Sequence, residues 1–596
     1  MSGTMKFTDS PEQAAVIQAP SYEDVVVVAG AGSGKTYTMT RRIITLIEQG
    51  VNPEKILGLT FTRKAASELL SRVSAAVSRN QRERGLKSAN MTFLKPEVST
   101  YDAFFQSIVR QYGLLVGFDQ NTQPLSEAGA MQLIHTVLDK HMVDLMAFDG
   151  DLKSFNTIAS NVFALSNAIS GAMIGSGCTS FDEAVQRVRD WDEAFIRQVD
   201  KALDGETVPT EQPKSPKPPK RLKKDSDADY EKKLEKYREL GHSMCVYNST
   251  QLASVAKQRN LLLDLVLDYH AEKQACNMAE FSDFTIAAFQ LVSRFPSIGA
   301  TYRKRYSHVL LDEYQDTSTT QAALLSALFH ADDTHRSAVN AVGDPFQSIY
   351  AWRGASPGAF RMLQHDFGMD ATSKPFALTV TRRNSRMVLE AANNLTKPLR
   401  LPARRLSSSL MREVDVPALS NIEEAPEGTI GVLGFATFGQ EVDAVVRFAK
   451  HAIALHTPSA RDLDHGAKDN RPHVAVLFRS KGTMSKYAEA LEQAGLTTLV
   501  VGQAALLERP EVQDVFALLH VVSDHTDSAA LMRLLATPRF AVEADDLQAL
   551  ADTAERVNTV YRYRALVSAG IVPAQTTKAG NSGDSINSGD SRKTSN

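Results

Sequence analysis

The sequence predicts an α/β fold in which a parallel sheet is interrupted by a helical insertion. Two observations support this prediction. Short apolar runs repeatedly precede segments with helical spacing, a pattern typical of parallel βαβ units. In residues 113–280 helical periodicity dominates instead, and the strand-and-helix pattern resumes at His308.

Composition limits the class of protein. The chain has 596 residues, enough for about three or four domains, and 43% hydrophobic with 23% charged residues is ordinary for a soluble globular protein. We expect a cytoplasmic protein, because no apolar run approaches the ~20 residues of a membrane span and the first residues lack an apolar leader. Cys178, Cys245 and Cys276 lie too far apart for a disulfide framework or a four-ligand metal site. A net charge of -3 does not exclude a nucleic-acid binder, since a local basic groove suffices.

The stretch Val25–Thr36, VVVVAGAGSGKT, predicts a buried strand followed by a phosphate-binding loop and a helix. In such a loop backbone N–H groups hold the phosphates, the lysine contacts β- and γ-phosphate oxygens, and the threonine hydroxyl ligates Mg²⁺. The strict pattern has glycine where this chain has Ala29, so the match is to the looser A-x-x-x-x-G-K-T form. The predicted nucleoside triphosphate site consists of Ala29, Gly30, Ala31, Gly32, Ser33, Gly34, Lys35 and Thr36.

A short helix is expected just before this strand. Ser10 can cap its N-terminus, and Pro11 suits the first helical position. Gln13 in its first turn can be interpreted in two ways. It is either plain helix surface or a side chain whose amide, both donor and acceptor, reads the edge of an adenine.

Further strand-and-helix units follow the loop. Tyr37–Gln49 has helical spacing and ends at Gly50, and the apolar strand Ile56–Thr62 leads into an amphipathic helix over Arg63–Val73. Val98–Phe105 repeats the pattern, with hydroxyls and aromatic residues at the end of the strand. Ligands of open α/β sheets gather at these carboxyl ends.

The helical insertion contains one segment that cannot pack a core. Pro209–Lys224, PTEQPKSPKPPKRLKK, is rich in proline and lysine. Two interpretations remain open for it: a solvated linker, or a segment that is attracted to the phosphate backbone of a nucleic acid.

After the insertion, an apolar strand beginning at His308 ends in two carboxylates. We expect Asp312 to hold Mg²⁺, usually through water, and Glu313 to orient and deprotonate the attacking water. A second strand in Ala341–Ala355 is followed by a turn that carries Gln347, Tyr350, Trp352 and Arg353. This turn is either a buried aromatic pair with a surface arginine or a platform for base stacking and phosphate contact.

Together these stretches resemble the superfamily 1 DNA helicases of the UvrD/Rep/PcrA type. The matching segments, in family order from about residue 7 to 520, are PEQAAVI, AGAGSGKT, LGLTFTRKAASELLSRV, LLDEYQDTS, VGDPFQSIYAWRGA, LTVTRRNSRMVLEAANNL, AVLFRS and ERPEVQD. The resemblance implies P-loop NTPase domains of the RecA-like fold. The implied division is 1–112 with 281–376 (ATP-binding domain 1A), 113–280 (helical insertion 1B), 377–523 (partial RecA-like domain 2A), 524–570 (start of a helical 2B-like region) and 571–596 (disordered tail).

The resemblance also implies roles for individual residues. Gln13 would read adenine, Glu313 would be the catalytic base and Asp312 the Mg²⁺ ligand together with Thr36. Gln347 would sense the γ-phosphate and couple it to the DNA side, and Arg383 would reach the γ-phosphate across the cleft. The implied DNA contacts are Phe61, Thr62, Arg63, Tyr350, Trp352 and Arg353, and Asp283 matches an acidic motif near the end of the insertion.

Three positions depart from the family pattern. The family usually has arginine after the loop threonine and tyrosine before the cross-cleft arginine, where this chain has Tyr37 and Arg382. The swapped pair keeps one aromatic and one guanidinium face for the adenine, so stacking should survive. Asp102 stands where the family commonly places a histidine that contacts DNA. A carboxylate repels phosphate, so we do not expect that contact here.

The C-terminal part is expected to encode only part of the second motor domain. The predicted strands of this domain are Gly428–Leu433, Val474–Ser480 and Thr497–Val501, with a helix at EALEQAG. The chain is expected to become helical after Asp524 and to end in a disordered tail. The later family motifs T-x-H-x-x-K-G-L-E and V-A-x-T-R-A are not found, which predicts a shortened helicase or one whose partner supplies them.

Two functional hypotheses follow. The first is an ATP-dependent DNA translocase and helicase, with ATP and Mg²⁺ as cofactors, which the resemblance implies moves 3′→5′ on single strands and at duplex junctions in repair or recombination. The second is a module that binds ATP and DNA without unwinding, motivated by the missing motifs. A kinase or GTPase that uses the loop alone does not account for the DEYQ and QSIYAWRG motifs.

Overall fold

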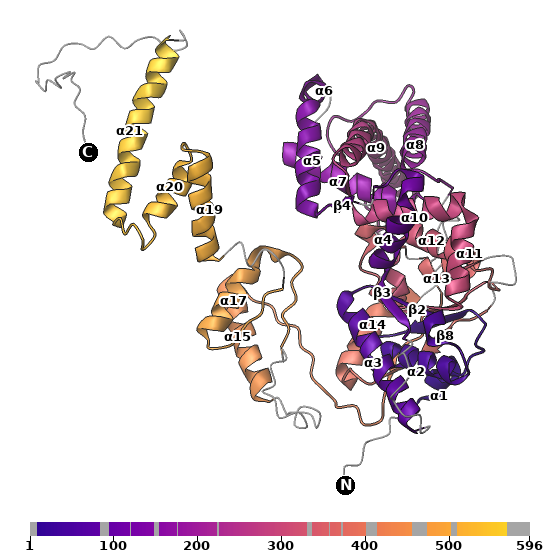
Figure 1. Cartoon of the computed structure of the whole chain (residues 1–596). Helices are drawn as coiled ribbons and strands as arrows, with labels where there is room; N and C mark the ends of the chain where they lie inside the picture. The colour runs from indigo at the N-terminus through magenta and orange to yellow at the C-terminus, as the bar shows by residue number, and fades with distance from the viewer. Residues whose placement is uncertain are drawn as a thin grey trace, which may run out of the picture. The chain divides into compact units, whose positions relative to one another are not determined.

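The structure is a computed structural model of the chain (Figure 1). It describes residues 9–83, 95–119, 121–147, 154–175, 177–222, 226–330, 336–356, 358–370, 373–400, 414–455, 474–501 and 509–568. The chain divides into two compact units, Met1–Ile430 and Gly431–Asn596. The predicted tail over 571–596 lies outside the described residues. Among the helices of the described ranges, none has the length and apolar character that crossing a membrane requires.

A six-stranded parallel sheet forms the centre of the first unit, in the order β3-β2-β6-β7-β1-β8. Its strands are β1 (Val25–Ala29), β2 (Ile56–Thr60), β3 (Glu97–Thr100), β6 (His308–Leu311), β7 (Ala338–Gly343) and β8 (Phe376–Leu378). In register, Leu57 of β2 lies opposite Val309 on one side and Glu97 on the other. The predicted α/β fold with a parallel sheet is confirmed.

Helices cover both faces of this sheet (Figure 1). One face carries α1 (Pro11–Ile17), α2 (Lys35–Glu48) and α3 (Arg63–Glu83). The other carries α4 (Tyr101–Tyr112), α10 (Phe281–Arg294), α11 (Pro296–Arg305), α12 (Thr319–Phe329) and α13 (Ala359–Asp366). Alternate residues of β1 enter opposite cores, Val25 and Val27 on one face and Val26 and Val28 on the other. A strand buried on both faces needs such an uninterrupted apolar run.

The insertion is helical, as predicted, and has its own core. Its helices are α5 (Glu127–Lys140), α6 (Met142–Ala147), α7 (Phe155–Ala172), α8 (Phe181–Ala202) and α9 (Asp227–Ala275). Apolar residues of α5, α7 and α8 pack on the C-terminal half of α9, where Leu263, Val266 and Tyr269 are buried. The short parallel pair β4 (Gln123–Pro124) and β5 (Met278–Ala279) joins its two ends.

The predicted linker has no helix or strand in its described part, residues 209–222, and the side chains there are exposed or half-buried. Residues 223 and 224 lie outside the described residues. The remaining elements of the first unit are the 3₁₀ turns η1 (Pro53–Lys55), η2 (Gly113–Val116), η3 (Tyr314–Asp316), η4 (Pro345–Gln347) and η5 (Ala351–Arg353), with α14 (Arg386–Arg400) and the strand pair β9 (Val380–Thr381) and β10 (Ser420–Asn421).

The second unit is helical in its described part. It contains α15 (Phe438–Ala454), η6 (Lys481–Thr483), α17 (Met484–Gln493), α19 (Pro510–Ser523), α20 (Ser528–Leu535) and α21 (Ala544–Ser568). The helix predicted at EALEQAG and the helical region after Asp524 are therefore confirmed.

The strands predicted at Gly428–Leu433, Val474–Ser480 and Thr497–Val501 are wrong. None of these segments pairs with another strand among the residues that the structure describes. Their apolar side chains are correspondingly exposed, Leu477 by 93% and Leu499 by 83%. β-branched residues favour an extended backbone, but they do not by themselves form a strand. A strand also needs a neighbouring backbone that accepts and donates its hydrogen bonds.

Candidate functional site

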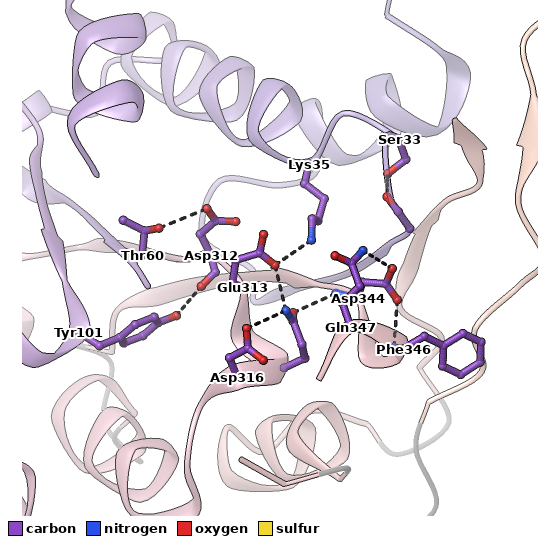
Figure 2. A network of polar contacts seen from close by, with 12 residues as sticks. Ser33, Lys35, Thr60, Tyr101, Asp312, Glu313, Asp316, Asp344, Phe346 and Gln347 are labelled. Atoms are coloured by element: carbon purple, nitrogen blue, oxygen red, sulfur yellow. Dashed lines mark hydrogen bonds and ion pairs between the residues drawn. The ribbon is translucent and has the colours of Figure 1, made fainter. Parts of the chain in front are cut away.

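The candidate site lies at the carboxyl edge of the sheet, where loops from three neighbouring strands meet. The phosphate-binding loop follows β1, Asp312 and Glu313 follow β6, and Asp344 follows β7. In a parallel sheet these ends share one edge, which is where ligands of open α/β folds bind. Figure 2 shows Lys35 and Glu313, from two of these loops, pointing toward each other.

The loop after β1 has the geometry of an anion-binding turn. Gly32 and Gly34 have φ values of +77° and +89°, which glycine adopts without steric cost. Ser33 Oγ donates to the Gly30 carbonyl oxygen at 2.8 Å and closes the turn. α2 begins at Lys35 with no side-chain cap on its N-terminus, so the first backbone N–H groups are available to an anion. Ala29 is the fully buried last residue of β1, and its methyl group is part of the core on one face of the sheet.

Lys35 and Glu313 meet at this edge. Lys35 Nζ lies 2.7 Å from Glu313 Oε2 (Figure 2). The contact joins the first residue of α2 to the loop that follows β6. The lysine that is expected to bind phosphate therefore lies beside the carboxylate that the sequence predicts as the base.

Asp312 is buried beside Glu313. Its Oδ2 accepts a 3.5 Å hydrogen bond from Thr60 Oγ1, and the Tyr101 hydroxyl donates to its backbone oxygen at 3.0 Å. Its Oδ1 is buried without a hydrogen-bond partner among the described residues. Burial raises the pKa of Asp312 to about 6, with the Glu313 charge adding to the rise and Lys35 opposing it. A buried carboxylate oxygen without a partner suits a cation.

The donor set fits Mg²⁺ better than a soft metal. Asp312 and the Thr36 hydroxyl of α2 supply oxygen atoms, the ligands that Mg²⁺ prefers. In the described part of the chain, no group of three or more His, Cys, Asp and Glu side chains is arranged to hold a metal ion. Mg²⁺ commonly uses only one or two carboxylates and completes its shell with water and phosphate oxygens.

Gln315 is a site residue that the sequence reasoning missed. Its Nε2 donates to Glu313 Oε2 at 2.9 Å and to Asp316 Oδ2 at 3.3 Å, while its Oε1 accepts from the Asp344 backbone N–H at 3.0 Å. The side chain is 2% exposed, so the amide must be bonded on both sides. The only sequence signal was its position in DEYQD, close behind the two carboxylates.

Gln347 is connected to the same network. Its Nε2 donates to Asp344 Oδ2 at 2.7 Å, and Asp344 Oδ1 accepts from the Phe346 N–H at 3.0 Å. Hydrogen bonds therefore run from Glu313 through Gln315 and Asp344 to Gln347 (Figure 2). The predicted γ-phosphate sensor lies at the expected edge of the sheet, and its role stays a prediction.

The end of β9 and the residues that follow it lie directly on the phosphate-binding loop. Thr381 Oγ1 donates to the Ala31 carbonyl oxygen at 2.8 Å, and the Arg382 N–H donates to the Gly32 carbonyl oxygen at 3.0 Å. A Cβ on Gly32 would lie 2.5 Å from Arg383 Cβ. The structure therefore places the backbone of Arg382 and Arg383 against the phosphate-binding loop, and their roles at the adenine and the γ-phosphate stay predictions.

The predicted adenine neighbours also lie near the loop. Burial and a 2.7 Å hydrogen bond to Asp9 raise the pKa of Tyr37, while the charge of nearby Arg382 lowers it. Gln13 is buried: its Nε2 donates to the Ser33 carbonyl oxygen at 3.1 Å, and its Oε1 accepts from the Ser10 N–H at 3.0 Å. Each end of the amide retains capacity for one more bond. Adenine recognition by Gln13 therefore stays a prediction.

An aromatic cluster lies on the loop after β7. The ring centroids of Phe61 and Tyr350 are 4.8 Å apart, and those of Tyr350 and Trp352 are 6.1 Å apart. The Arg353 guanidinium lies 4.6 Å from the centre of the Trp352 ring. Because Trp352 is 65% exposed, the interpretation as a buried aromatic pair is wrong. Thr62 and Arg63 are exposed beside Phe61 at the start of α3.

Two further acidic residues have other partners. Asp102 Oδ1 accepts from Gln321 Nε2 at 3.2 Å, and burial raises the pKa of Asp102 while the Arg353 charge lowers it. Asp283 is in a buried ion pair at the start of α10, with Lys273 Nζ 2.7 Å from its Oδ2. Neither contact joins the network around Glu313.

Comparison with known proteins assigns the chain to a family. Residues 9–368 match the UvrD/REP helicase N-terminal domain, which covers more than half of the chain. The chain belongs to the UvrD/REP helicase family. Residues 383–562 of this family member also match the UvrD-like helicase C-terminal domain. The resemblance seen in the motifs is thereby confirmed.

Curated relatives of this UvrD/REP family member are named as ATP-dependent DNA helicases. UvrD1 of Mycobacterium bovis is 26% identical over 570 residues, an alignment that covers 93% of this chain and 58% of the relative. PcrA of Bacillus subtilis is 24% identical, with 94% of this chain and 59% of the relative covered. Rep of Escherichia coli is 24% identical, with 89% and 60% covered. The chain thus spans less than two thirds of the length of these relatives.

Proposed function

We propose that this chain is an ATP-dependent DNA translocase and helicase. One observation carries the proposal. A continuous hydrogen-bonded path joins Glu313, beside the phosphate-binding loop, to the loop that presents the exposed Trp352. An enzyme that converts nucleotide hydrolysis into movement on DNA needs such a connection. The names of its relatives, ATP-dependent DNA helicases, agree with it.

ATP would bind at the edge of the sheet with its phosphates in the loop of residues 29–36. Lys35 would contact the β- and γ-phosphate oxygens, and Tyr37 and Arg382 would stack on the two faces of the adenine. Gln13 would contribute its remaining amide capacity to the adenine edge. Arg383 would reach the γ-phosphate, a type of contact that is typically worth 10³–10⁵ in rate.

Glu313 would act as the base of hydrolysis. In the structure its carboxylate is paired with Lys35, and phosphate oxygens would compete for that lysine. Glu313 would then remain held by Gln315 and be available to accept a proton from the attacking water. Mg²⁺ held by Asp312 and Thr36 would supply neutralisation of charge on the phosphate oxygens. Gln347 would sense the γ-phosphate through its position beside Asp344.

Single-stranded DNA would bind over the aromatic cluster. Stacking on Tyr350 and Trp352 supplies roughly 1–3 kcal/mol per base and tolerates any sequence, as a translocase requires. Arg353, Arg63 and Thr62 would contact phosphates or sugars beside Phe61. Movement in the 3′→5′ direction, action at duplex junctions and a role in repair or recombination are proposed from the family resemblance alone.

We also propose the family's domain organisation for the chain. Residues 1–112 with 281–376 would form domain 1A, 113–280 the insertion 1B, 377–523 a partial domain 2A and 524–570 the start of 2B.

A second candidate function, ATP and DNA binding without unwinding, is favoured by one observation. The three segments expected to form strands of domain 2A are unpaired in the described residues.

ATP hydrolysis measured with and without single-stranded oligonucleotide tests the proposal. We expect turnover that DNA stimulates and that Glu313→Gln abolishes, because an amide cannot accept the proton. Nucleotide binding by Glu313→Gln should persist, which serves as the control for folding. Turnover that is wholly indifferent to DNA would refute the coupling, whereas binding of ATP and DNA without turnover would favour the second candidate.

A further inference from the structure

The helical insertion touches the aromatic loop at a point where neither backbone carries a side chain. Gly171 lies in the last turn of α7, and Gly354 follows η5. A Cβ on Gly171 would lie 3.0 Å from the Arg353 carbonyl oxygen and 3.1 Å from Gly354 Cα. A Cβ on Gly354 would lie 2.8 Å from Gly171 Cα, and Gly354 has a φ of +86°. The two backbones therefore touch with no room for a methyl group between them.

We propose that the last turn of α7 is a positioning element for DNA binding: contact through Gly171 fixes the loop that presents Tyr350, Trp352 and Arg353. The inference rests on the proposed DNA-binding function and deepens it. Direct backbone contact transmits displacement without loss, because no flexible side chain lies between the two segments to absorb it.

The same turn of α7 also holds the helix that follows the catalytic carboxylates. Thr320, in the first turn of α12, lies with its Oγ1 2.7 Å from the Ser170 carbonyl oxygen and 3.2 Å from that of Ile174. The side chain of Thr320 is 1% exposed. Carbonyl groups at a helix C-terminus lack partners within the helix, and here a buried hydroxyl from α12 provides one.

The aromatic loop and the start of α12 are joined directly as well. Ser318, just before α12, and Ala355, at the end of the loop, form an antiparallel bridge. The end of α7, the start of α12 and the aromatic loop thus all touch one another. A shift of α7 therefore has to move the loop, the helix or both.

Within the described residues, no hydrogen bond or ion pair joins the end of α7 to the phosphate-binding loop or to the network around Glu313. The atoms nearest to a Cβ on Gly171 belong to Arg353 and Gly354, and the Ser170 carbonyl oxygen accepts from Thr320. Disturbing Gly171 should therefore weaken DNA binding more than it lowers hydrolysis without DNA. This separation distinguishes a positioning role from a contribution to general stability.

The experiment enlarges Gly171 and compares it with a glycine in open space. Gly171→Ala and Gly171→Leu are matched to Gly241→Ala and Gly241→Leu, because Gly241 lies in α9 of the same insertion with no described atom within 4 Å of an added Cβ. The chain has two tryptophans, so Trp191→Phe leaves Trp352 as the reporter in all variants. Trp352 emission, affinity for oligo(dT), and turnover with and without oligo(dT) are measured.

We expect Gly171→Leu to shift the Trp352 emission before DNA is added and to weaken oligo(dT) affinity about fivefold or more, the loss of one stacked base. Gly171→Ala should have a smaller effect of the same kind, since the backbone of Arg353 and Gly354 would have to move by only a few tenths of an ångström to admit the Cβ. Turnover without DNA and the KM for ATP should change much less than the affinity for oligo(dT). Both Gly241 variants should behave as the parent in every measurement.

The outcomes separate the inference from the proposed function. If the parent binds no oligo(dT) and gains no turnover from it, the proposed function fails. If the parent is stimulated and both Gly171 variants retain its affinity and emission, the positioning inference is wrong and the proposed function stands. If Gly171→Ala and Gly171→Leu lose turnover without DNA as strongly as they lose DNA affinity, the contact serves general stability, and the inference is equally overturned.

Discussion

The backbone of Glu313 is strained, and the strain lies at the nucleotide edge. Its φ of 52° is in the left-handed region, which costs a non-glycine residue roughly 1–2 kcal/mol. Lys35 Nζ at 2.7 Å and Gln315 Nε2 at 2.9 Å hold its carboxylate in place. Strain of this kind persists only where the surroundings over-determine it, which agrees with a functional rather than a packing role.

Replacing Trp352 tests the proposed DNA surface at the level of one side chain. Trp352→Ala should weaken binding of single-stranded DNA by about 1–3 kcal/mol, the worth of one stacked base. Turnover without DNA should change little, because Trp352 is exposed and its ring lies against Tyr350 and Arg353, away from Glu313 and Lys35 in the hydrogen-bonded network. Fluorescence anisotropy of labelled oligo(dT) gives the affinity. The exposed Trp191 provides a matched control, and an unchanged affinity in Trp352→Ala would contradict the stacking role.

Asp316 gives a pH-dependent stability prediction with a definite sign. Burial, followed by the charge of Glu313, raises the pKa of Asp316 from 3.8 to about 6. The folded state therefore binds the proton more tightly than the unfolded state does, and this contribution is complete below about pH 4. It declines as the pH rises from about 4 to about 6, and at pH 7 the ionised carboxylate costs stability.

Asparagine mimics the protonated side chain at every pH. Asp316→Asn should raise the free energy of unfolding at pH 7 by about 1–3 kcal/mol and leave it unchanged below about pH 4. Urea unfolding at several pH values measures the difference. Asp200→Asn, on the exposed face of α8, serves as the control with little expected effect. An equal gain for Asp316→Asn at pH 3.5 and pH 7 would exclude the titration of this carboxyl as the cause.

At the scale of elements, the sequence predictions succeeded where an element depends on local interactions and failed where it depends on residues distant in the chain. The strand at Val25–Ala29 and the capped helix at Pro11 were predictable, because β-branched burial and N-capping are local. The unpaired segment Thr497–Val501 was not, because pairing depends on a distant backbone. Gln315 was missed for a related reason: its bonds to Glu313 and Asp344 join two loops that only the sheet order brings together.

For the Pro/Lys-rich segment, the structure favours one of the two interpretations, the solvated linker over attraction to nucleic-acid phosphates. Its described lysines are exposed, and Arg221 pairs with Asp227 of the adjoining helix rather than facing open solvent alone. We therefore expect a solvated linker. The triple variant Lys214→Gln, Lys217→Gln and Lys220→Gln should keep the affinity of the parent for single-stranded DNA at every salt concentration.

The salt dependence of binding is the measurement that discriminates. Removing one lysine that neutralises a phosphate of a single strand would reduce the slope of log affinity against log salt by about 0.7. A slope lowered by that amount or more in the triple variant would replace the linker interpretation with phosphate attraction. Replacement of Lys232, on an exposed face of α9, gives a control for the loss of positive charge in general.

At the scale of the whole molecule, family membership and local structure give different information. Both halves of the chain match UvrD/REP helicase domains, yet only the first unit forms a parallel sheet in the described residues. The nucleotide-binding edge, the segment Thr381–Arg383 and the aromatic loop all belong to the first unit. Binding and hydrolysis of ATP are therefore expected from contacts within the first unit. Unwinding is expected to require both units.

Unwinding of tailed duplexes tests whether the whole chain separates strands. We expect ATP-dependent separation of a duplex with a 3′ single-stranded tail, and little separation of a blunt duplex or one with a 5′ tail, because a 3′→5′ translocase approaches a junction only along the 3′ tail. Glu313→Gln provides the control, since it should bind the 3′-tailed substrate without separating it. DNA-stimulated hydrolysis with no separation of any substrate would favour a translocating or binding module. Preference for the 5′ tail would refute the direction taken from the family resemblance.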